Sequence, residues 1–353
     1  MRYTGMTITP PPVVLRVFAL LLLACALPNA ALAEPYKPDA GPYKVDTFLL
    51  ELHDAKRDRA VPVKVYRPVG ADGRRPIVLV SHGLGGTREG LSYLGKHWAS
   101  HGYVCVHMQH HGSDDAVWKD AEPSERLAAM RRAALDPSNA TRRAGDTTFV
   151  LDVLTRMSDD TTSKLFNAVD LDRAGIAGHS FGAWTCLAAG GMTMGGLREV
   201  RLNDPRIRCM IPLSPPVVNS EKRYQRTYKT LDIPALFMTG TLDTSVINDT
   251  TAEQRLVPYK FMPGPKDGGA PKYQINFDGA DHMTFSGETR INRRMRNADP
   301  QTDPVFHALI LQSTTAFLDC YLLGEETAKQ WLNEGAFVKA VGKHGDVEMD
   351  VEQ

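Results

Sequence analysis

The sequence has no excess of charge of either sign. Its 353 residues carry 41 lysines and arginines against 41 aspartates and glutamates, and no long block of like charge interrupts the chain. Proteins that bind nucleic acid commonly carry a basic patch or stripe, and binding to an anionic surface needs one as well. We therefore expect no nucleic acid and no anionic surface as a partner.

Cysteine is also scarce, with five residues, and none forms the CxxC or Cys/His pattern of a zinc site. Cys25 lies in the leader described below. The other four are widely spaced in apolar surroundings: Cys105, Cys186, Cys209 and Cys320. Cysteine is among the most buried residue types, so buried free thiols are expected, although export would permit disulfides.

The chain lacks an uninterrupted apolar run of membrane-spanning length. Residues 17–27 form a run of 11, against roughly 20 for a spanning helix. This run follows a segment with two arginines and no acid, and it leads through Pro28 to small residues ending at Ala33. That order is typical of a secretory signal peptide. We expect cleavage after Ala33, export to the periplasm or beyond, and no stable membrane span afterwards.

Two alternatives remain for this leader. It could be an uncleaved membrane anchor, or a lipoprotein signal that ends at Cys25. Leu23, two residues before that cysteine, fits a lipoprotein signal poorly.

After the leader, short apolar runs alternate with segments whose apolar residues recur at the spacing of a helix. Two strands are expected within residues 48–66 around a polar turn. Further strands are expected at 76–80, 103–108, 174–177, 209–213, 234–238 and 273–277, with helices at 183–189 and, as the last helix, within 305–323. Apolar strands that alternate with helices are typical of a mostly parallel sheet covered on both faces. We therefore expect one α/β domain over residues 34–353.

One long connection between two of these strands departs from the alternation of strands and helices. Residues 114–143 are rich in charge and contain a helical stretch near 125–134. Connections of this length without strands are often functional loops or lids. The segment is therefore a candidate lid.

A serine stands between two glycines directly after the strand expected at 174–177, in the sequence GHSFG (178–182). A tight turn from strand to helix lifts such a serine hydroxyl above the sheet edge, and the helix N-terminus favours negative charge there. A serine hydroxyl is a weak nucleophile that needs a base, and the base needs an orienting acid. Ser180 is thus a candidate nucleophile, with acid and then base expected further along the chain.

The acid and the base are each expected one loop after a later strand. Asp243 and His282 occupy these places. Asp249 is the nearest competitor for the acid. Asp278 and Asp281 lie too close in sequence to His282 to orient its ring from the far side.

The sequence SHGLGG (81–86) follows the strand expected at 76–80. A loop of this kind offers a backbone N–H to a developing oxyanion, and the residue after the nucleophile supplies a second N–H. One such donor contributes roughly 3–4 kcal/mol to lowering a barrier. Leu84, with Gly83 as its neighbour, and Phe181 are the candidate donors.

In these motifs the chain resembles the α/β-hydrolase superfamily. Within it, the chain is similar to serine esterases grouped with dienelactone-hydrolase-like proteins, platelet-activating-factor acetylhydrolases and bacterial polyester hydrolases. The resemblance implies an α/β-hydrolase fold, Ser180 as nucleophile, Asp243 as acid, His282 as base, and Leu84 and Phe181 as oxyanion donors. It rests on SHGLGG (81–86), GHSFG (178–182), GTLD (240–243) and GADHMTFSG (279–287). Dienelactone hydrolases use a cysteine nucleophile, so the serine here favours ordinary carboxylic esters.

The expected function is therefore that of an exported serine hydrolase. It would cleave small or lipid-like carboxylic esters through an acyl-enzyme, without a cofactor or metal. Alternatives are a lipase, a phospholipid deacetylase, a polyester hydrolase, and a non-catalytic binding protein on a hydrolase shell. A metal-dependent hydrolase built on His107, His110 and His111 is a further rival, although their spacing matches no zinc motif. His82 and His179 lie in turns, where structural roles are expected. The oligomeric state is not indicated.

Overall fold

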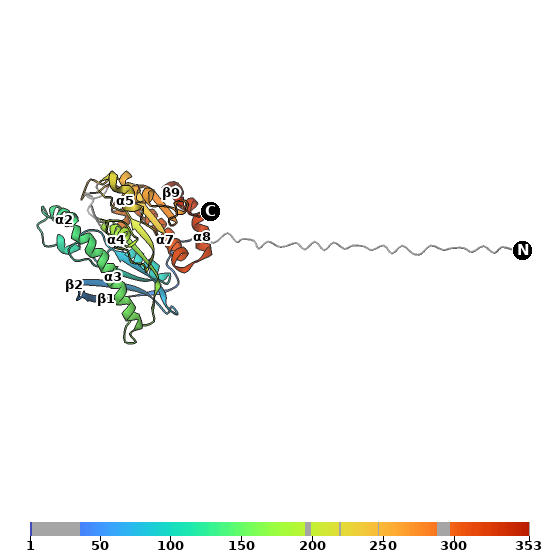
Figure 1. The fold of residues 1–353 in the computed structure, drawn as a ribbon, viewed down its shortest axis with the longest axis horizontal. Helices are drawn as coiled ribbons and strands as arrows, with labels where there is room; N and C mark the ends of the chain where they lie inside the picture. The colour runs from blue at the N-terminus through green and yellow to red at the C-terminus, as the bar shows by residue number, and fades with distance from the viewer. Residues whose placement is uncertain (2–35, 195–198, 219, 246, 288–296, 353) are drawn as a thin grey trace. The chain divides into compact units, whose positions relative to one another are not determined.

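Besides Met1, the computed structural model describes residues 36–194, 199–218, 220–245, 247–287 and 297–352 (Figure 1). The expected signal peptide therefore lies outside the described residues, apart from Met1. The described part forms a nine-stranded sheet in the order β1-β2-β4-β3-β5-β6-β7-β8-β9. Its strands are β1 Lys44–Asp54, β2 Arg59–Val69, β3 Arg75–Ser81, β4 Val104–Met108, β5 Val169–His179, β6 Ile207–Leu213, β7 Ala235–Leu242, β8 Lys272–Asp281 and β9 Gly345–Asp350.

The inner strands, from β4 to β8 in the sheet, pair in parallel, whereas β1, β2 and β9 pair antiparallel at the two edges. Parallel strands need both faces covered, and alternate side chains of β3 show this. Ile77 and Leu79 enter one core cluster, and Val78 and Val80 enter the other. The expectation of a mostly parallel α/β sheet is confirmed.

Helices cover both faces of this sheet (Figure 1). One face packs against α3 Pro137–Asp159, α4 Phe181–Ala189, α5 Tyr224–Tyr228 and α6 Val257–Phe261. The other packs against α1 Ser92–Ser100, α7 Asp303–Leu318, α8 Glu326–Asn333 and α9 Ala336–Val341. A further helix, α2 Arg126–Leu135, lies in the candidate lid.

Helix α3 was not expected from the sequence. It begins with Pro137 at its first position, and the Asp136 carboxylate caps it by accepting from the Ser138 N–H at 2.9 Å, as these residue types favour. The candidate lid at 114–143 therefore runs into a helix of the core, because Arg143 is fully buried. A lid role for the preceding residues stays a prediction.

The expectation that the helix within 305–323 is the last one is wrong. Helix α7 continues as a π-helical turn, Asp319–Leu323, and is followed by α8, α9 and β9. The short α9 and the polar edge strand GDVEMD carry too weak a pattern to be found by periodicity. Among the described residues, Asp303–Leu323 is apolar and long enough to cross a membrane by length and composition, but 56% of its most apolar stretch of 18 residues is buried in the fold, as in a core helix.

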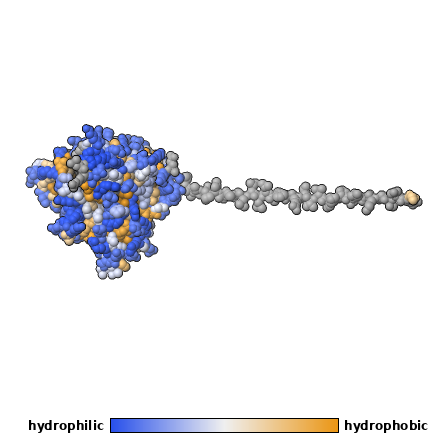
Figure 2. Space-filling view, in the orientation of Figure 1, coloured by the Kyte–Doolittle hydropathy of each residue, from blue (hydrophilic) through white to orange (hydrophobic). Residues whose placement is uncertain are grey.

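The four cysteines of the described residues are free, and three of them are buried. Cys105, Cys186 and Cys209 are buried free thiols, and Cys320 is a half-buried one. On the face drawn in Figure 2, hydrophilic residues predominate and hydrophobic ones are scattered. Large exposed apolar side chains come from several elements: Leu49, Val69, Leu127, Leu135 and Phe166 are among them.

The order of the strands reverses next to β3. The chain passes from β3 to β4 on one side and then returns to place β5 on the other side. Open α/β sheets bind ligands outside the carboxyl ends of their strands at such a switch point. Ser81 at the end of β3 pairs in register with Gly178 of β5, so the SHGLGG loop and the GHSFG turn leave the sheet at the same level.

Candidate active site

The turn between β5 and α4 holds Ser180 in a strained conformation. Its φ of 57° and ψ of −116° are rare for a residue with a side chain, and such strain clusters at functional sites. A Cβ on Gly182 would collide with the Ser81 carbonyl oxygen, and one on Gly178 would collide with the Gly182 backbone. The two glycines thus let the turn at residues 178–182, called the elbow below, pass close to β3.

The structure brings together the three residues expected to form the triad. His282 follows β8 and its Nε2 lies 3.0 Å from Ser180 Oγ. Asp243 follows β7 and its Oδ1 lies 2.8 Å from His282 Nδ1. An Nδ1–H that donates to this carboxylate leaves Nε2 free to accept the serine proton. These distances meet the geometric requirement for a nucleophile, a base and an orienting acid.

The competing carboxylates face elsewhere. Asp249 is exposed. Asp278 accepts a hydrogen bond from Thr241 Oγ1, and Asp281 accepts the backbone N–H groups that follow it. None of the three contacts the His282 ring among the described hydrogen bonds.

Two further residues hold the acid–base pair, and the sequence reading missed both. Ser214, directly after β6, places its Oγ 2.6 Å from His282 Nδ1. Arg255, 2% exposed, places Nε 2.7 Å from Asp243 Oδ1 and donates through Nη1 to the Ser214 carbonyl at 3.0 Å. The signal for Ser214 is its place at the carboxyl end of an inner strand. Arg255 lies in a short 3-10 helix, Glu253–Leu256, in the long connection between β7 and β8, and the sequence there gave no signal.

These contacts fix the charges of the pair. Burial opposes ionisation of Asp243, but the positive charges of Arg255 and His282 hold its pKa at about 2. Burial, followed by the charge of Arg255, lowers the pKa of His282 below its usual value, while Asp243 and Asp281 oppose this shift. A neutral imidazole beside an ionised carboxylate is the state in which a histidine accepts a proton.

The lowered pKa of His282 predicts where activity is lost in acid. Because the base works when neutral, kcat/KM is expected to stay high through pH 6.5, the ordinary histidine value, and to fall with a midpoint below it. The measurement is kcat/KM for a soluble ester between pH 4 and 9, with recovery at pH 7 as the control for acid unfolding. A midpoint above 7, or a flat rate down to pH 4, would contradict His282 as the base.

The two candidate oxyanion donors lie beside the nucleophile. A Cβ on Gly83 would stand 3.5 Å from Ser180 Cβ, so the loop from β3 borders the elbow. Phe181 is the first residue of α4, where a backbone N–H has no partner within the helix. In the part of the chain that the structure describes, neither its N–H nor that of Leu84 donates to a protein acceptor. Both remain available to a ligand oxygen.

The other histidines are held by protein groups. His179 Nε2 lies 2.8 Å from the His282 carbonyl oxygen, which ties the elbow to the base. The three histidines of the metal-dependent alternative have separate partners: His107 with the Gly90 carbonyl, His110 with Asp146, and His111 with Asp114. Among the described residues, no three His, Cys, Asp or Glu side chains gather in a way that could hold a metal ion.

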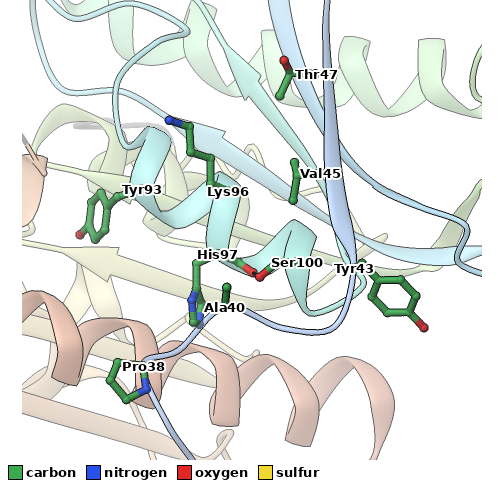
Figure 3. Close-up of a pocket in the computed structure, with 9 residues that line it drawn as sticks. All are labelled: Pro38, Ala40, Tyr43, Val45, Thr47, Tyr93, Lys96, His97 and Ser100. Atoms are coloured by element: carbon green, nitrogen blue, oxygen red, sulfur yellow. Dashed lines mark hydrogen bonds between the residues drawn. The ribbon is translucent and has the colours of Figure 1, made fainter.

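A surface cavity of about 530 Å³ lies apart from these residues (Figure 3). Side chains of α1 face the N-terminal segment across it. Its lining consists of Pro38, Ala40, Tyr43, Val45, Thr47, Tyr93, Lys96, His97 and Ser100. Because it contains no member of the triad and neither oxyanion donor, it is not the site of the chemistry described here.

Comparison with known proteins agrees with this geometry. Residues 47–127, which include the SHGLGG loop, match the family model of platelet-activating factor acetylhydrolase, isoform II. Cutinase est2 of Thermobifida alba is 25% identical over 206 residues, covering 58% of this chain and 52% of the cutinase. Platelet-activating factor acetylhydrolase of Cavia porcellus is 25% identical over 303 residues, covering 77% and 63%. The chain thus spans less than two thirds of these relatives' length.

The resemblance to this superfamily that the motifs suggested is therefore supported by both the fold and the matches. The parallel sheet, the strained turn after β5 and the chain order of serine, aspartate and histidine are common to its members. The chain therefore has an α/β-hydrolase fold and is similar to ester hydrolases of this superfamily.

Proposed function

We propose that this protein hydrolyses carboxylic esters, with Ser180 as nucleophile, His282 as base and Asp243 as acid. The observation that carries the proposal is the pair of contacts made by one imidazole, 3.0 Å to Ser180 Oγ and 2.8 Å to Asp243 Oδ1. Both are within reach for proton transfer. The relatives named cutinase and platelet-activating factor acetylhydrolase are carboxylic-ester hydrolases, which supports the same reaction class.

The geometry translates into two half-reactions. His282 Nε2 takes the Ser180 proton as Oγ attacks the ester carbonyl carbon. The tetrahedral oxyanion accepts from the N–H groups of Leu84 and Phe181, while Asp243 stabilises the imidazolium. His282 then protonates the leaving alcohol, and an acyl-enzyme remains. Water, deprotonated by the same histidine, attacks the acyl group, and the acid leaves with Ser180 restored.

The proposal also covers the location of the enzyme and the class of its substrates. The apolar run at 17–27 and the small residues ending at Ala33 support export, to the periplasm or beyond. The relatives support small or lipid-like esters as substrates. The name of one relative specifies removal of an acetyl group, which favours short acyl chains here.

Hydrolysis of p-nitrophenyl acetate, butyrate and octanoate by the purified protein tests this function. We expect turnover of acetate and butyrate, a lower rate with octanoate, and no loss of activity in EDTA. A preference for octanoate would indicate the lipase alternative. Loss of activity in EDTA would favour a metal-dependent hydrolase, and absence of turnover with every ester would contradict the proposal.

A further inference from the structure

A fully buried arginine lies directly behind the loop and the elbow that carry the two candidate oxyanion donors. Arg143 projects from the second turn of α3 and has 0% exposure. Its guanidinium donates to backbone carbonyls and to hydroxyl oxygens. These partners are the His82 carbonyl at 2.6 Å, Ser113 Oγ at 2.9 Å, Ser81 Oγ at 3.3 Å, and the carbonyls of Gly83 and Ser113 at 3.4 Å.

The contact with Gly83 bears on the first donor because one peptide group contains both. The Gly83 carbonyl and the Leu84 N–H belong to the same planar trans peptide, so they point in opposite directions. Three donors converge on that carbonyl: Arg143 Nη2 at 3.4 Å, His82 Nδ1 at 2.6 Å and the Gly86 N–H at 3.2 Å. They therefore fix the direction of the Leu84 N–H, and they polarise it toward stronger donation.

The state of His82 is fixed as well. Its Nε2 accepts the His110 backbone N–H at 3.1 Å, so the ring hydrogen lies on Nδ1 and is given to the Gly83 carbonyl. Burial, with the nearby charge of Arg143, keeps the pKa of His82 well below its usual value. His82 is thus a neutral donor that works together with Arg143.

The same guanidinium contacts the second donor residue. The central carbon of the Arg143 guanidinium lies 4.3 Å from the centre of the Phe181 ring, a close cation–π contact. One cation thereby touches both the peptide that presents the Leu84 N–H and the residue that presents the other N–H.

Arg143 is also buried without a direct counter-ion. Among the described residues, no carboxylate forms an ion pair with it, and Asp146, the nearest acid along α3, is paired with Arg57, Arg59 and His110. A buried cation whose hydrogen-bond partners are all neutral is costly, and the charges of Asp146 and Asp114 offset that cost without a direct contact. The cost falls when a negative charge develops nearby, as it does on the substrate oxygen in ester hydrolysis.

We propose that Arg143 is a positioning residue that holds the Leu84 and Phe181 N–H groups for the oxyanion and places a buried positive charge behind them. This inference rests on the proposed esterase function. It assigns a role in the reaction to the helix that begins inside the candidate lid.

The test compares Arg143→Lys, which keeps the charge but loses the planar fork, with Arg143→Met, which loses both. Arg59→Lys is the matched control, because Arg59 joins the same buried network through Asp146 and does not contact the loop. We expect kcat for p-nitrophenyl butyrate to fall by about 10²-fold in Arg143→Met, since loss of one oxyanion donor costs roughly 10²–10³. Arg143→Lys should lose less, KM should change little, and Arg59→Lys should stay within about threefold.

A second readout separates this role from a loss of structure. The affinity for a trifluoromethyl ketone, whose adduct with a serine carries an oxyanion, should fall in proportion to kcat in the Arg143 variants. The acid limb of the pH profile and the circular dichroism spectrum should stay as in the wild type. If Arg143→Met does not fold, kcat and ketone affinity are compared between Arg143→Lys and the wild type.

Wild-type kcat in both Arg143 variants, or a loss of kcat without a matching loss of ketone affinity, would overturn the inference while leaving the esterase function standing. Absence of ester hydrolysis by the wild type would overturn both. The two failures are therefore distinguishable.

Discussion

Replacing Ser180 with alanine is expected to lower kcat for p-nitrophenyl butyrate by a factor on the order of 10⁶. Without Oγ, no atom lies in place to form the acyl-enzyme, and His282 Nε2 has no proton to take at 3.0 Å. Activity left by the oxyanion donors and by substrate binding would be roughly 10³–10⁴ above that of water. Stability should change little, because the Oγ makes one described hydrogen bond, to His282.

Ser214→Ala is the matched control for this experiment. Ser214 is a second serine on the same imidazole, with Oγ 2.6 Å from Nδ1, and it also has a positive φ of 53°. Because it touches the side of the ring that faces the acid, its loss should cost about tenfold or less. Equal losses in the two variants, or a loss below about tenfold in Ser180→Ala, would contradict Ser180 as the nucleophile.

Replacing Asp243 with asparagine is expected to lower kcat by roughly 10²–10⁴, the upper value being the loss when the histidine tautomer is wrong as well. In this site, Oδ1 accepts from both Arg255 and His282, and the variant's amide oxygen would take that place because Arg255 can only donate. The imidazole would then keep its tautomer but lose the negative charge that stabilises it when protonated. Arg255 would be left buried without its counter-ion, which disfavours the imidazolium further.

Asp278→Asn is the control for the acid, because this exposed carboxylate lies near the end of β8, shortly before His282, and no described hydrogen bond joins it to the His282 ring. Its kcat should stay within about threefold of the wild type. The fraction of folded Asp243→Asn is measured by circular dichroism, since an unpaired Arg255 also lowers stability. An active Asp243→Asn beside an inactive Asp278→Asn would show that the acid has been misassigned.

The sequence could place the three residues of the proposed triad because each directly follows an apolar strand. Inner strands of a parallel sheet are buried on both faces, so their runs are conspicuous, as at Pro76–Val80 and in Cys209–Leu213. Their carboxyl ends meet at one edge of the sheet. Chain order along that edge then distinguishes Ser180, Asp243 and His282 from other polar residues.

Helix α3 and the residues behind the site could not be predicted from hydrophobic periodicity, and the reason is physical. The inward face of the first half of α3 is polar, with Asn139, Arg143, Asp146 and Thr147 buried. Hydrophobic periodicity cannot detect a helix whose buried side carries charge. The sequence of residues 114–143 therefore suggests an exposed, charged lid, whereas its last residues form the first turns of α3, with Asn139 and Arg143 buried.

Arg143 and Arg255 support the site through contacts that no local pattern encodes. Arg143 reaches Ser81 across 62 residues, and Arg255 reaches Ser214 across 41. Arg143 stands among polar and small residues, and Arg255 follows the polar pair Glu253 and Gln254, so neither is marked as buried by its neighbours in the sequence. Their burial follows from tertiary packing of the α3 segment and the loop after β7, which a single sequence does not specify.

Covalent labelling of the purified wild-type protein with a fluorophosphonate, followed by peptide mapping, tests the central claim most directly. The reagent forms a stable adduct with a serine that an adjacent base activates. The account predicts one adduct, on the peptide that contains Ser180, none there in Ser180→Ala, and slower labelling in Asp243→Asn. No adduct on the wild type, or an adduct on a different residue such as Ser214, would contradict it.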